Sequence, residues 1–389
     1  MWLSDLSIIL RDLVIPCGAL RIEGGQIAEI VETSGQPTHT VFPGFVDMHG
    51  DMIELELEPR TGVDFPMDVA LMHLDARLAA SGVTTAYASV SFSRGAKDGQ
   101  RRSYNHTCAV IRGLKAAKDE MRVDHRIHAR FDIAFTAAID ALEGLLDDGA
   151  VDLVSVMDHT PGQGQYRNLE RFIELRAANK GITLEESRAN VKAWIAAATP
   201  EEEIVRNLHR VSALCRSYGV PVASHDDDTV AKAELMADIG AVISEFPVTI
   251  EAARAAAARG LMVAMGAPNA MRGQSYSGNL SARDAHAVGL LHILAADYHP
   301  AAILPAIRSL APQDPGGLPG AVRLGSANPA QALGLAYRGE IAVGKRADLA
   351  IVDARDRVVA TLCNGETVYQ NGTFLISSPA NRTLSSVVA

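Results

Sequence analysis

The stretch VFPGFVDMHGDMIE, from Val41 to Glu54, starts like a buried strand and ends in an imidazole and carboxylates. Its first six residues carry no charge, and Asp47, His49 and Asp51 then follow at every second position. Side chains two positions apart on a strand point to the same side, so His49 and Asp51 can aim at one point, as metal ligands must. A histidine at a strand end often serves only as a hydrogen-bonding residue. The other strand ends of the chain therefore decide between the two interpretations.

Further strand-like runs follow this stretch, and Ala-rich amphipathic segments separate most of them. The eight runs read FVDMHGD, VTTAYASVS, HRIHARFDI, VDLVSVMDH, VPVASHDDD, AVISEFP, LMVAMGAPN and LHILAADY. Alternating strands and helices over residues 43–334 predict an α/β fold, a TIM-like (β/α)8 barrel, for which about 250 residues is typical. A doubly wound open sheet would not need the eighth strand.

Residues 1–42 and 335–389 differ from this central segment, because both contain short strand-like runs with turn signals. Gly24-Gly25 in the first piece and Asn364-Gly365 and Asn371-Gly372 in the second are typical of hairpins. Each piece alone is short for a stable domain, and the two ends of a chain often lie close together. We therefore expect both termini to form one small β-sandwich domain beside the barrel.

The segment 165–219 is too long for a single crossover helix between two barrel strands. Its runs NLERFIELRAANKGI and LEESRANVKAWIAAA predict an inserted pair of helices. Because active sites of barrels lie at the carboxyl ends of the strands, such a pair can serve as a lid over the site.

The composition narrows the class of partner. The chain has 389 residues, 48% of them hydrophobic, and a formal net charge of −10. We expect it to bind neither nucleic acid nor an anionic membrane, because both need excess positive charge. The four cysteines form no CxxC pair, the N-terminus lacks a basic signal-like segment, and no apolar run is long enough to span a bilayer. These features predict a cytoplasmic protein, and they leave a homo-oligomer open.

Several other predicted strands also end in histidine or carboxylate. They are Asp158-His159, His225 with three aspartates after it, Asp297, and the set His128, Arg130 and Asp132 on one strand face. Such a set is costly to bury for packing alone. Imidazole and carboxylate are ligands of zinc, manganese and iron, and no thiol is needed. The joint pattern predicts a divalent-metal site at the mouth of the barrel.

Longer motifs resemble known proteins. The strand VFPGFVDMHGD and the tail GEIAVGKRADLAIVD resemble the amidohydrolase superfamily. The strings MDHTPGQGQYRN, ASHDDDT, GAPNAMRGQSYSGNLSA and LAADYHP resemble, more specifically, the PhnM family of triphosphate diphosphatases in the carbon–phosphorus lyase pathway. The resemblance covers nearly the whole chain. It implies the barrel, the composite β-domain and a binuclear metal centre.

By this resemblance two divalent ions, zinc in the first place and manganese or iron as alternatives, are bound by strand-end residues. The implied ligands are His49, Asp51, Asp132, His159, His225 and Asp297. Asp132 would bridge the ions, although related proteins usually carry Glu at that place, and Asp158 and Glu245 are the alternative bridges. His128 would orient a ligand from outside the metal shell.

The family reaction is hydrolysis of alpha-D-ribose 1-methylphosphonate 5-triphosphate to the 5-phosphate and diphosphate. The resemblance implies attack by a metal-bound hydroxide, with Asp297 and Asp132 as catalytic residues and Asp297 as proton acceptor. The polyanion needs donors, and the candidates are Arg130, Arg272, Ser275, Ser277 and Asn279. Gln274 and Tyr276 depart from the family pattern in this loop, which leaves the exact substrate open.

Two other hypotheses remain. An amidohydrolase that cleaves a C–N bond, as a cyclic amide hydrolase, a deacylase or a deaminase, would use the same fold and metals. Arg272 and the Ser/Asn string suit phosphate better than amide, and the predicted strand ends lack a lysine that can be carbamylated. A barrel that has lost its metals and serves as a scaffold would have eroded ligands, whereas this set looks intact.

Overall fold

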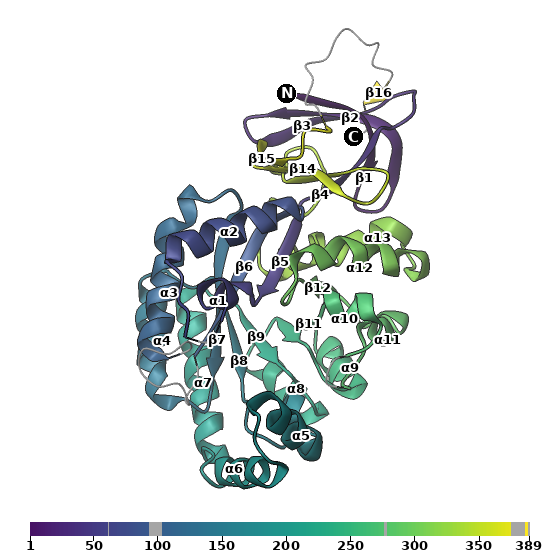
Figure 1. Cartoon of the computed structure of the whole chain (residues 1–389). Helices are drawn as coiled ribbons and strands as arrows, with labels where there is room; N and C mark the ends of the chain where they lie inside the picture. The colour runs from purple at the N-terminus through teal and green to yellow at the C-terminus, as the bar shows by residue number, and fades with distance from the viewer. Residues whose placement is uncertain (61, 93–102, 276–277, 375–385, 388–389) are drawn as a thin grey trace.

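The computed structural model describes residues 1–60, 62–92, 103–275, 278–374 and 386–387. Within them the chain forms two sheets (Figure 1). The larger sheet has eight strands, ordered β12-β11-β10-β9-β8-β7-β6-β5. Their bounds are β5 Phe45–Gly50, β6 Val83–Ser91, β7 Asp124–Asp132, β8 Leu153–Met157, β9 Val222–His225, β10 Ile243–Glu245, β11 Met262–Gly266 and β12 Ile293–Ala295.

All neighbouring strands of this sheet run parallel. Its two edges meet through a parallel bridge between Gly50 and Asp297, which nearly closes the barrel. The predicted TIM-like barrel is therefore confirmed, with each of the eight quoted runs forming one strand. The carboxyl ends of the strands gather the polar residues, as expected for this fold.

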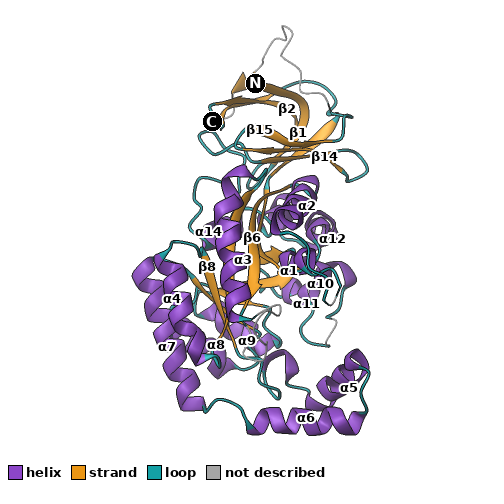
Figure 2. Cartoon of the chain, turned by 60° about the vertical axis from the view of Figure 1, so that its left-hand side comes forward, coloured by secondary structure: helices purple, strands orange, loops and turns teal. Residues whose placement is uncertain are grey.

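Helices surround the barrel (Figure 2). They are α1 Met52–Leu57, α2 Met67–Ala80, α3 Tyr104–Ala117, α4 Ile139–Asp147, α7 Glu201–Tyr218, α8 Val230–Asp238, α9 Ile250–Ala258, α10 Ala267–Arg272, α11 Ala282–Ala287, α12 Ile303–Leu310, α13 Gly317–Arg323 and α14 Ala327–Ala332. Short 3₁₀ helices cover Lys118–Glu120, Thr136–Ala138, Gly164–Tyr166, Pro300–Ala302 and Ala311–Gln313. No helix among the described residues is long and apolar enough to cross a membrane.

The barrel interior is filled by alternate strand residues, because successive side chains of a strand point to opposite faces. Val46 and Met48 of β5 belong to one buried cluster with Tyr87 of β6 and Leu153 of β8. Leu333, which follows α14, joins the same cluster. Burying each such side chain contributes about 1.5–3 kcal/mol, so this interior fixes the positions of the strand ends above it.

The second sheet combines both termini in the order β15-β14-β13-β4-β1-β2-β3-β16. Its strands are β1 Trp2–Ile9, β2 Val14–Glu23, β3 Gln26–Glu32, β4 His39–Pro43, β13 Leu349–Val352, β14 Val358–Cys363, β15 Glu366–Gln370 and β16 Ser386–Val387. N-terminal β4 lies between β1 and C-terminal β13. Leu6 and Leu20 share a buried cluster with Ile351 and Leu362. The small domain built from both termini is thus present, while its boundaries at 42/43 and 334/335 stay a prediction.

The helical insertion consists of α5 Leu169–Lys180 and α6 Leu184–Ala196, ahead of the crossover helix α7. Gly181 ends α5 with a left-handed backbone, φ 63°, and Thr183 with Glu186 forms a capping box that starts α6. These local signals favour two separate helices with a break at Gly181. Figure 1 shows the insertion and the small sheet at opposite ends of the barrel. Whether the pair moves as a lid stays a prediction.

Candidate metal centre

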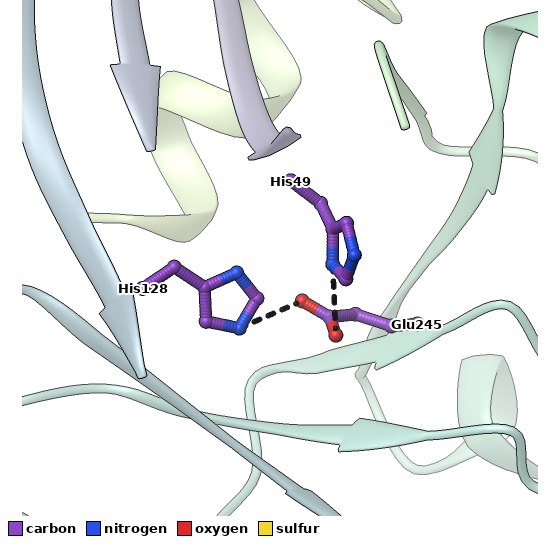
Figure 3. Close-up of side chains that lie close together, drawn as sticks. All are labelled: His49, His128 and Glu245. Carbon is purple, nitrogen blue, oxygen red and sulfur yellow. Dashed lines mark ion pairs between the residues drawn. The ribbon is translucent and has the colours of Figure 1, made fainter. Parts of the chain in front are cut away.

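Three buried residues from different strands meet at the centre of the mouth. His49 is the penultimate residue of β5, His128 lies on β7 and Glu245 ends β10. His49 Nδ1 lies 3.3 Å from Glu245 Oε2, and His128 Nε2 lies 3.5 Å from Glu245 Oε1. Figure 3 shows both imidazole rings pointing at the one carboxylate. One ligand atom of each residue falls within 4.8 Å of the others, which is close enough for a shared metal ion.

A second group lies next to the first. His159, His225 and Asp226 also place one ligand atom each within 4.8 Å of one another. His225 Nε2 lies 3.6 Å from Asp226 Oδ2, while His225 Nδ1 lies 3.0 Å from Glu245 Oε2. Glu245 therefore touches histidines of both groups, and a carboxylate in this position suits a bridge between two ions.

Four ligand atoms of the first group lack hydrogen-bond partners among the described residues, and this favours a bound cation. Both ring nitrogens of His49, Nε2 of His128 and Oε1 of Glu245 are buried without a hydrogen bond in the part of the chain that the structure describes. Each such buried polar group costs about 1–3 kcal/mol. Imidazole nitrogen and carboxylate oxygen are ligands of zinc, manganese and iron, so these residues fit a divalent metal.

The electrostatics indicate the same need for positive charge. Burial lowers the pKa of His49, but Asp51 and Glu245 outweigh it and raise the pKa to about 10. Burial alone would raise the pKa of Asp51, yet Arg130 and His49 hold it far below its usual range. Burial lowers the pKa of His128 to about 3. A divalent ion can supply the charge that a protonated His49 would otherwise provide.

Arg130 reaches into the mouth from β7. Its Nη1 donates to Asp51 Oδ1 at 2.7 Å, and its Nη2 lies 3.3 Å from Nε2 of His225. The predicted spacing of His49 and Asp51 also brings them together, with His49 Nε2 3.3 Å from Asp51 Oδ1. Arg130 is thus paired with Asp51 and fixes the position of that carboxylate, and it also lines the pocket.

Left-handed backbone at three strand ends turns side chains into the mouth. Asp226, Phe246 and Asp297 have φ values of 55°, 53° and 58°. Each such non-glycine residue costs on the order of 1–3 kcal/mol, a strain that clusters at functional sites. Backbone hydrogen bonds hold the turns, from Asp226 N to Glu245 O at 2.9 Å and from Asp297 N to His49 O at 2.8 Å.

Asp297 has the environment of a proton acceptor. Burial and the carboxylate of Asp51 raise the pKa of Asp297 to about 6. Gly266 makes room for it, because a Cβ at that position would lie 3.0 Å from Asp297 Oδ2. Asp47 links the two edge strands of the barrel. Its Oδ1 accepts hydrogen bonds from Ala296 N, next to β12, at 2.8 Å and from His49 N of β5 at 3.2 Å.

A pocket of about 250 Å³ opens over these residues. Of the predicted residues, those that line it are His49, Asp51, Arg130, His225, Arg272, Ser275, Asn279 and Asp297. His159 does not line this pocket but belongs to the second group of possible ligands. Ser277 and Tyr276 lie outside the described residues. The sequence-predicted site therefore comes together for the most part.

Asp132 and Asp158 lie elsewhere. Asp132 Oδ1 accepts from Ala134 N and Asp158 Oδ1 from Thr160 N, each at 2.9 Å, so both carboxylates stabilise the turns after their strands. Neither belongs to a ligand group or lines the pocket. Asp132 lies away from the centre because β7 extends past it. His128, four residues earlier on the same strand, lies at the level of the candidate ligands instead. Glu245, an alternative bridge in the prediction, takes the central place.

Asp226 is the residue that sequence reasoning missed. It follows His225 directly, so regular strand alternation would turn it to the opposite face. Only its left-handed backbone brings the carboxylate to His225. The one signal was the run of aspartates in ASHDDD, where aspartate tolerates such a conformation better than most residues.

Comparisons with known proteins agree with this geometry. The model of the amidohydrolase family matches residues 40–368. The alpha-D-ribose 1-methylphosphonate 5-triphosphate diphosphatase of Escherichia coli K12 is 34% identical over 367 residues, which cover 92% of this chain and 96% of that protein.

Solved structures share the fold at lower identity. A 5-methylcytosine deaminase from Klebsiella pneumoniae is 16% identical with a TM-score of 0.66 and covers 97% of this chain and 100% of its own. An N-acetyl-D-glucosamine-6-phosphate deacetylase from Mycobacterium smegmatis is 17% identical with a TM-score of 0.63. The match covers 95% of this chain and 100% of that protein. At this identity the similarity shows the common fold alone.

Proposed function

The chain belongs to the amidohydrolase family, and from this premise we propose that it hydrolyses alpha-D-ribose 1-methylphosphonate 5-triphosphate to the 5-phosphate and diphosphate. The observation that carries the proposal is its 34% identity, over nearly its whole length, to a protein with that printed activity. The pocket supports it, because Arg272, Ser275 and Asn279 line the rim above the candidate metal ligands. Guanidinium, hydroxyl and amide groups are suitable donors for phosphate oxygens.

We propose two divalent ions, zinc in the first place. His49, His128 and Glu245 would hold one, and His159, His225 and Asp226 the other, with Glu245 between them. Such ions lower the pKa of bound water and stabilise charge on phosphoryl oxygens. This ligand set keeps His49, His159 and His225 of the sequence-based one. It replaces Asp132 with Glu245, adds His128 and Asp226, and leaves Asp51 and Asp297 as pocket residues outside the set.

The remaining roles belong to the chain's own side chains. Asp297 faces the pocket and would accept the proton of the attacking water. Arg130 holds Asp51 and so fixes one wall of the site. Arg272 is exposed at the rim and, among the residues that the structure describes, has no carboxylate partner, so it is available for the polyphosphate. We further propose a cytoplasmic enzyme without a nucleic-acid or membrane partner, in line with its acidic charge.

The C–N hydrolase hypothesis uses the same barrel. The deaminase and deacetylase structures do not favour it, because their similarity shows the fold alone. The scaffold hypothesis would need eroded ligands, and the two groups of candidate ligands argue for an enzyme.

The test is phosphorus NMR of the purified protein, metal-loaded and then chelated, with the ribose methylphosphonate triphosphate and with ATP. We expect metal-dependent release of diphosphate from the first substrate, in preference to ATP. The variant His286→Gln serves as a control for a histidine outside the site and should cleave the substrate as the wild type does. His286 lies on α11, pairs with Asp314 at 2.9 Å and lines no part of this pocket. If neither triphosphate is cleaved by metal-loaded protein, the proposed reaction is wrong, and cyclic amides and acylated amino sugars become the next substrates.

A further inference from the structure

A second cavity lies beside the catalytic pocket. It has a volume of about 320 Å³ and is lined by residues of α5 in the helical insertion together with Gln165, Tyr166, Asn168 and Asn279. Gln165 and Asn279 line both this cavity and the pocket over the metal ligands. The two cavities are therefore adjacent, with these two side chains at their boundary.

The wall formed by α5 is cationic. Arg171, Arg176 and Lys180 line it, and its described lining residues include no aspartate or glutamate. This is a local excess of positive charge in a chain with a formal net charge of −10. Lys180 lies in the last turn of α5, where the helix dipole favours a cation, and Arg171 lies 4.0 Å from Glu174. Arg176 is the cation that neither effect explains.

Arg176 is half-buried and has no ion-pair or hydrogen-bond partner within the described parts of the chain. Its Nε is buried without an acceptor, and its guanidinium carbon lies 5.6 Å from the centre of the Trp194 ring. Phe172 braces Trp194 from α5 with 6.2 Å between ring centroids. A guanidinium that stacks on an aromatic ring and has no carboxylate partner can donate to an oxyanion through its Nη groups.

Apolar surface lies next to this charge. Tyr166 and Phe172 line the same cavity with their ring centroids 4.3 Å apart. A ligand that fits must therefore combine an anionic oxygen with an apolar group. A methylphosphonate ester has both features, because its phosphorus carries a negative oxygen and a methyl group.

We propose that this cavity is a second oxyanion subsite, which binds the phosphonate end of the substrate while the triphosphate end lies at the metal ligands. The assignment of the phosphonate rests on the proposed function. Arg176 is then a specificity-determining residue, since it binds the part of the substrate that does not react. Binding energy of this kind acts on KM more than on kcat when the ground state and the transition state share it.

The first test compares Arg176→Gln with Arg188→Gln. Arg188 lies on α6 of the same insertion, pairs with exposed Glu170 at 2.6 Å and does not line the cavity. For the methylphosphonate substrate we expect KM of R176Q to rise about tenfold or more with kcat nearly unchanged, as for a lost charge-assisted hydrogen bond. With ribose 5-triphosphate, which lacks the phosphonate, R176Q and R188Q should behave alike. Equal KM values for both variants with the phosphonate substrate would overturn the proposal.

The second test needs no turnover. The chain has two tryptophans, so Trp2→Phe leaves Trp194 beside Arg176 as the only reporter. Titration with ethyl methylphosphonate at constant ionic strength should change its fluorescence in a saturable manner. The change should persist with R188Q and disappear with R176Q. A saturable signal in a protein that fails to hydrolyse the triphosphate would retain the subsite and reject the proposed function, and the absence of any saturable signal would reject the subsite.

Discussion

Replacing Glu245 by glutamine should weaken metal binding at both proposed positions at once. Glu245 is fully buried, and its carboxylate lies 3.0–3.5 Å from nitrogens of His49, His128 and His225. Glutamine keeps the shape of the side chain but removes the charge. Even residues outside the metal shell change affinity about 10- to 100-fold, so loss of a shared ligand should weaken each ion by about 100-fold or more.

The size of the effect on stability follows from linkage. About 100-fold weaker binding of one ion removes about 2.7 kcal/mol of stabilisation when the metal is in excess, and two ions make about 5 kcal/mol. The unfolding entropy of 389 residues is roughly 0.8 kcal/mol/K, so Tm should fall by about 6 °C. By the same reasoning, removal of metal with a chelator should lower the Tm of the wild type much more than that of E245Q.

The assay is metal content by mass spectrometry after dialysis, together with thermal unfolding with and without chelator. Glu54→Gln is the matched control, because Glu54 is also a buried glutamate but accepts a hydrogen bond from Ser91 N at 3.1 Å and belongs to neither ligand group. E54Q should keep its metal. If E245Q retains two ions at wild-type affinity, the reasoning on the bridge is wrong.

Three further predictions concern the pocket and the barrel. Gly266→Ala should lower kcat at least about tenfold while metal content is kept, because its Cβ would meet the Asp297 carboxylate at 3.0 Å; unchanged kinetics would contradict the role of Asp297. Arg272→Gln should lower kcat/KM for triphosphates about tenfold and leave metal content unchanged, and an unchanged kcat/KM would speak against phosphate binding by Arg272. Asp75→Asn tests a pH effect: burial would raise the pKa of Asp75, but hydrogen bonds from His125 and from two backbone N–H groups hold it below its ordinary 3.8. Its stabilisation is therefore present above about pH 4 and lost as the pH falls, so D75N should unfold about 1–3 kcal/mol more easily at pH 7, with the gap narrowing toward pH 3 in urea titrations; a constant gap would refute this.

The barrel could be predicted because its signals are local and repeated. Each strand is a short apolar run between Ala-rich helices, and the first one changes from apolar to polar at the level where the site begins. Gly181 and the capping box at Thr183 mark the ends of the inserted helices in the sequence itself. The composite small domain followed from the turn signals, such as Gly24-Gly25, whose φ values of 57° and 79° confirm the turn.

The candidate metal ligands were predictable only in part, because their positions depend on strand length and backbone conformation. His49, His159 and His225 could be found as histidines at strand ends. Asp132 was expected to bridge the ions, but β7 extends beyond the centre and places His128 there instead. Asp226 joins through a left-handed backbone that no periodicity indicates.

The most direct test of the central claim is a crystal structure of the metal-loaded protein with anomalous diffraction recorded at the metal absorption edge. The account predicts two anomalous peaks, one among His49, His128 and Glu245 and one among His159, His225 and Asp226, with the Glu245 carboxylate between them. A single peak, or a peak at Asp132 away from Glu245, would contradict it.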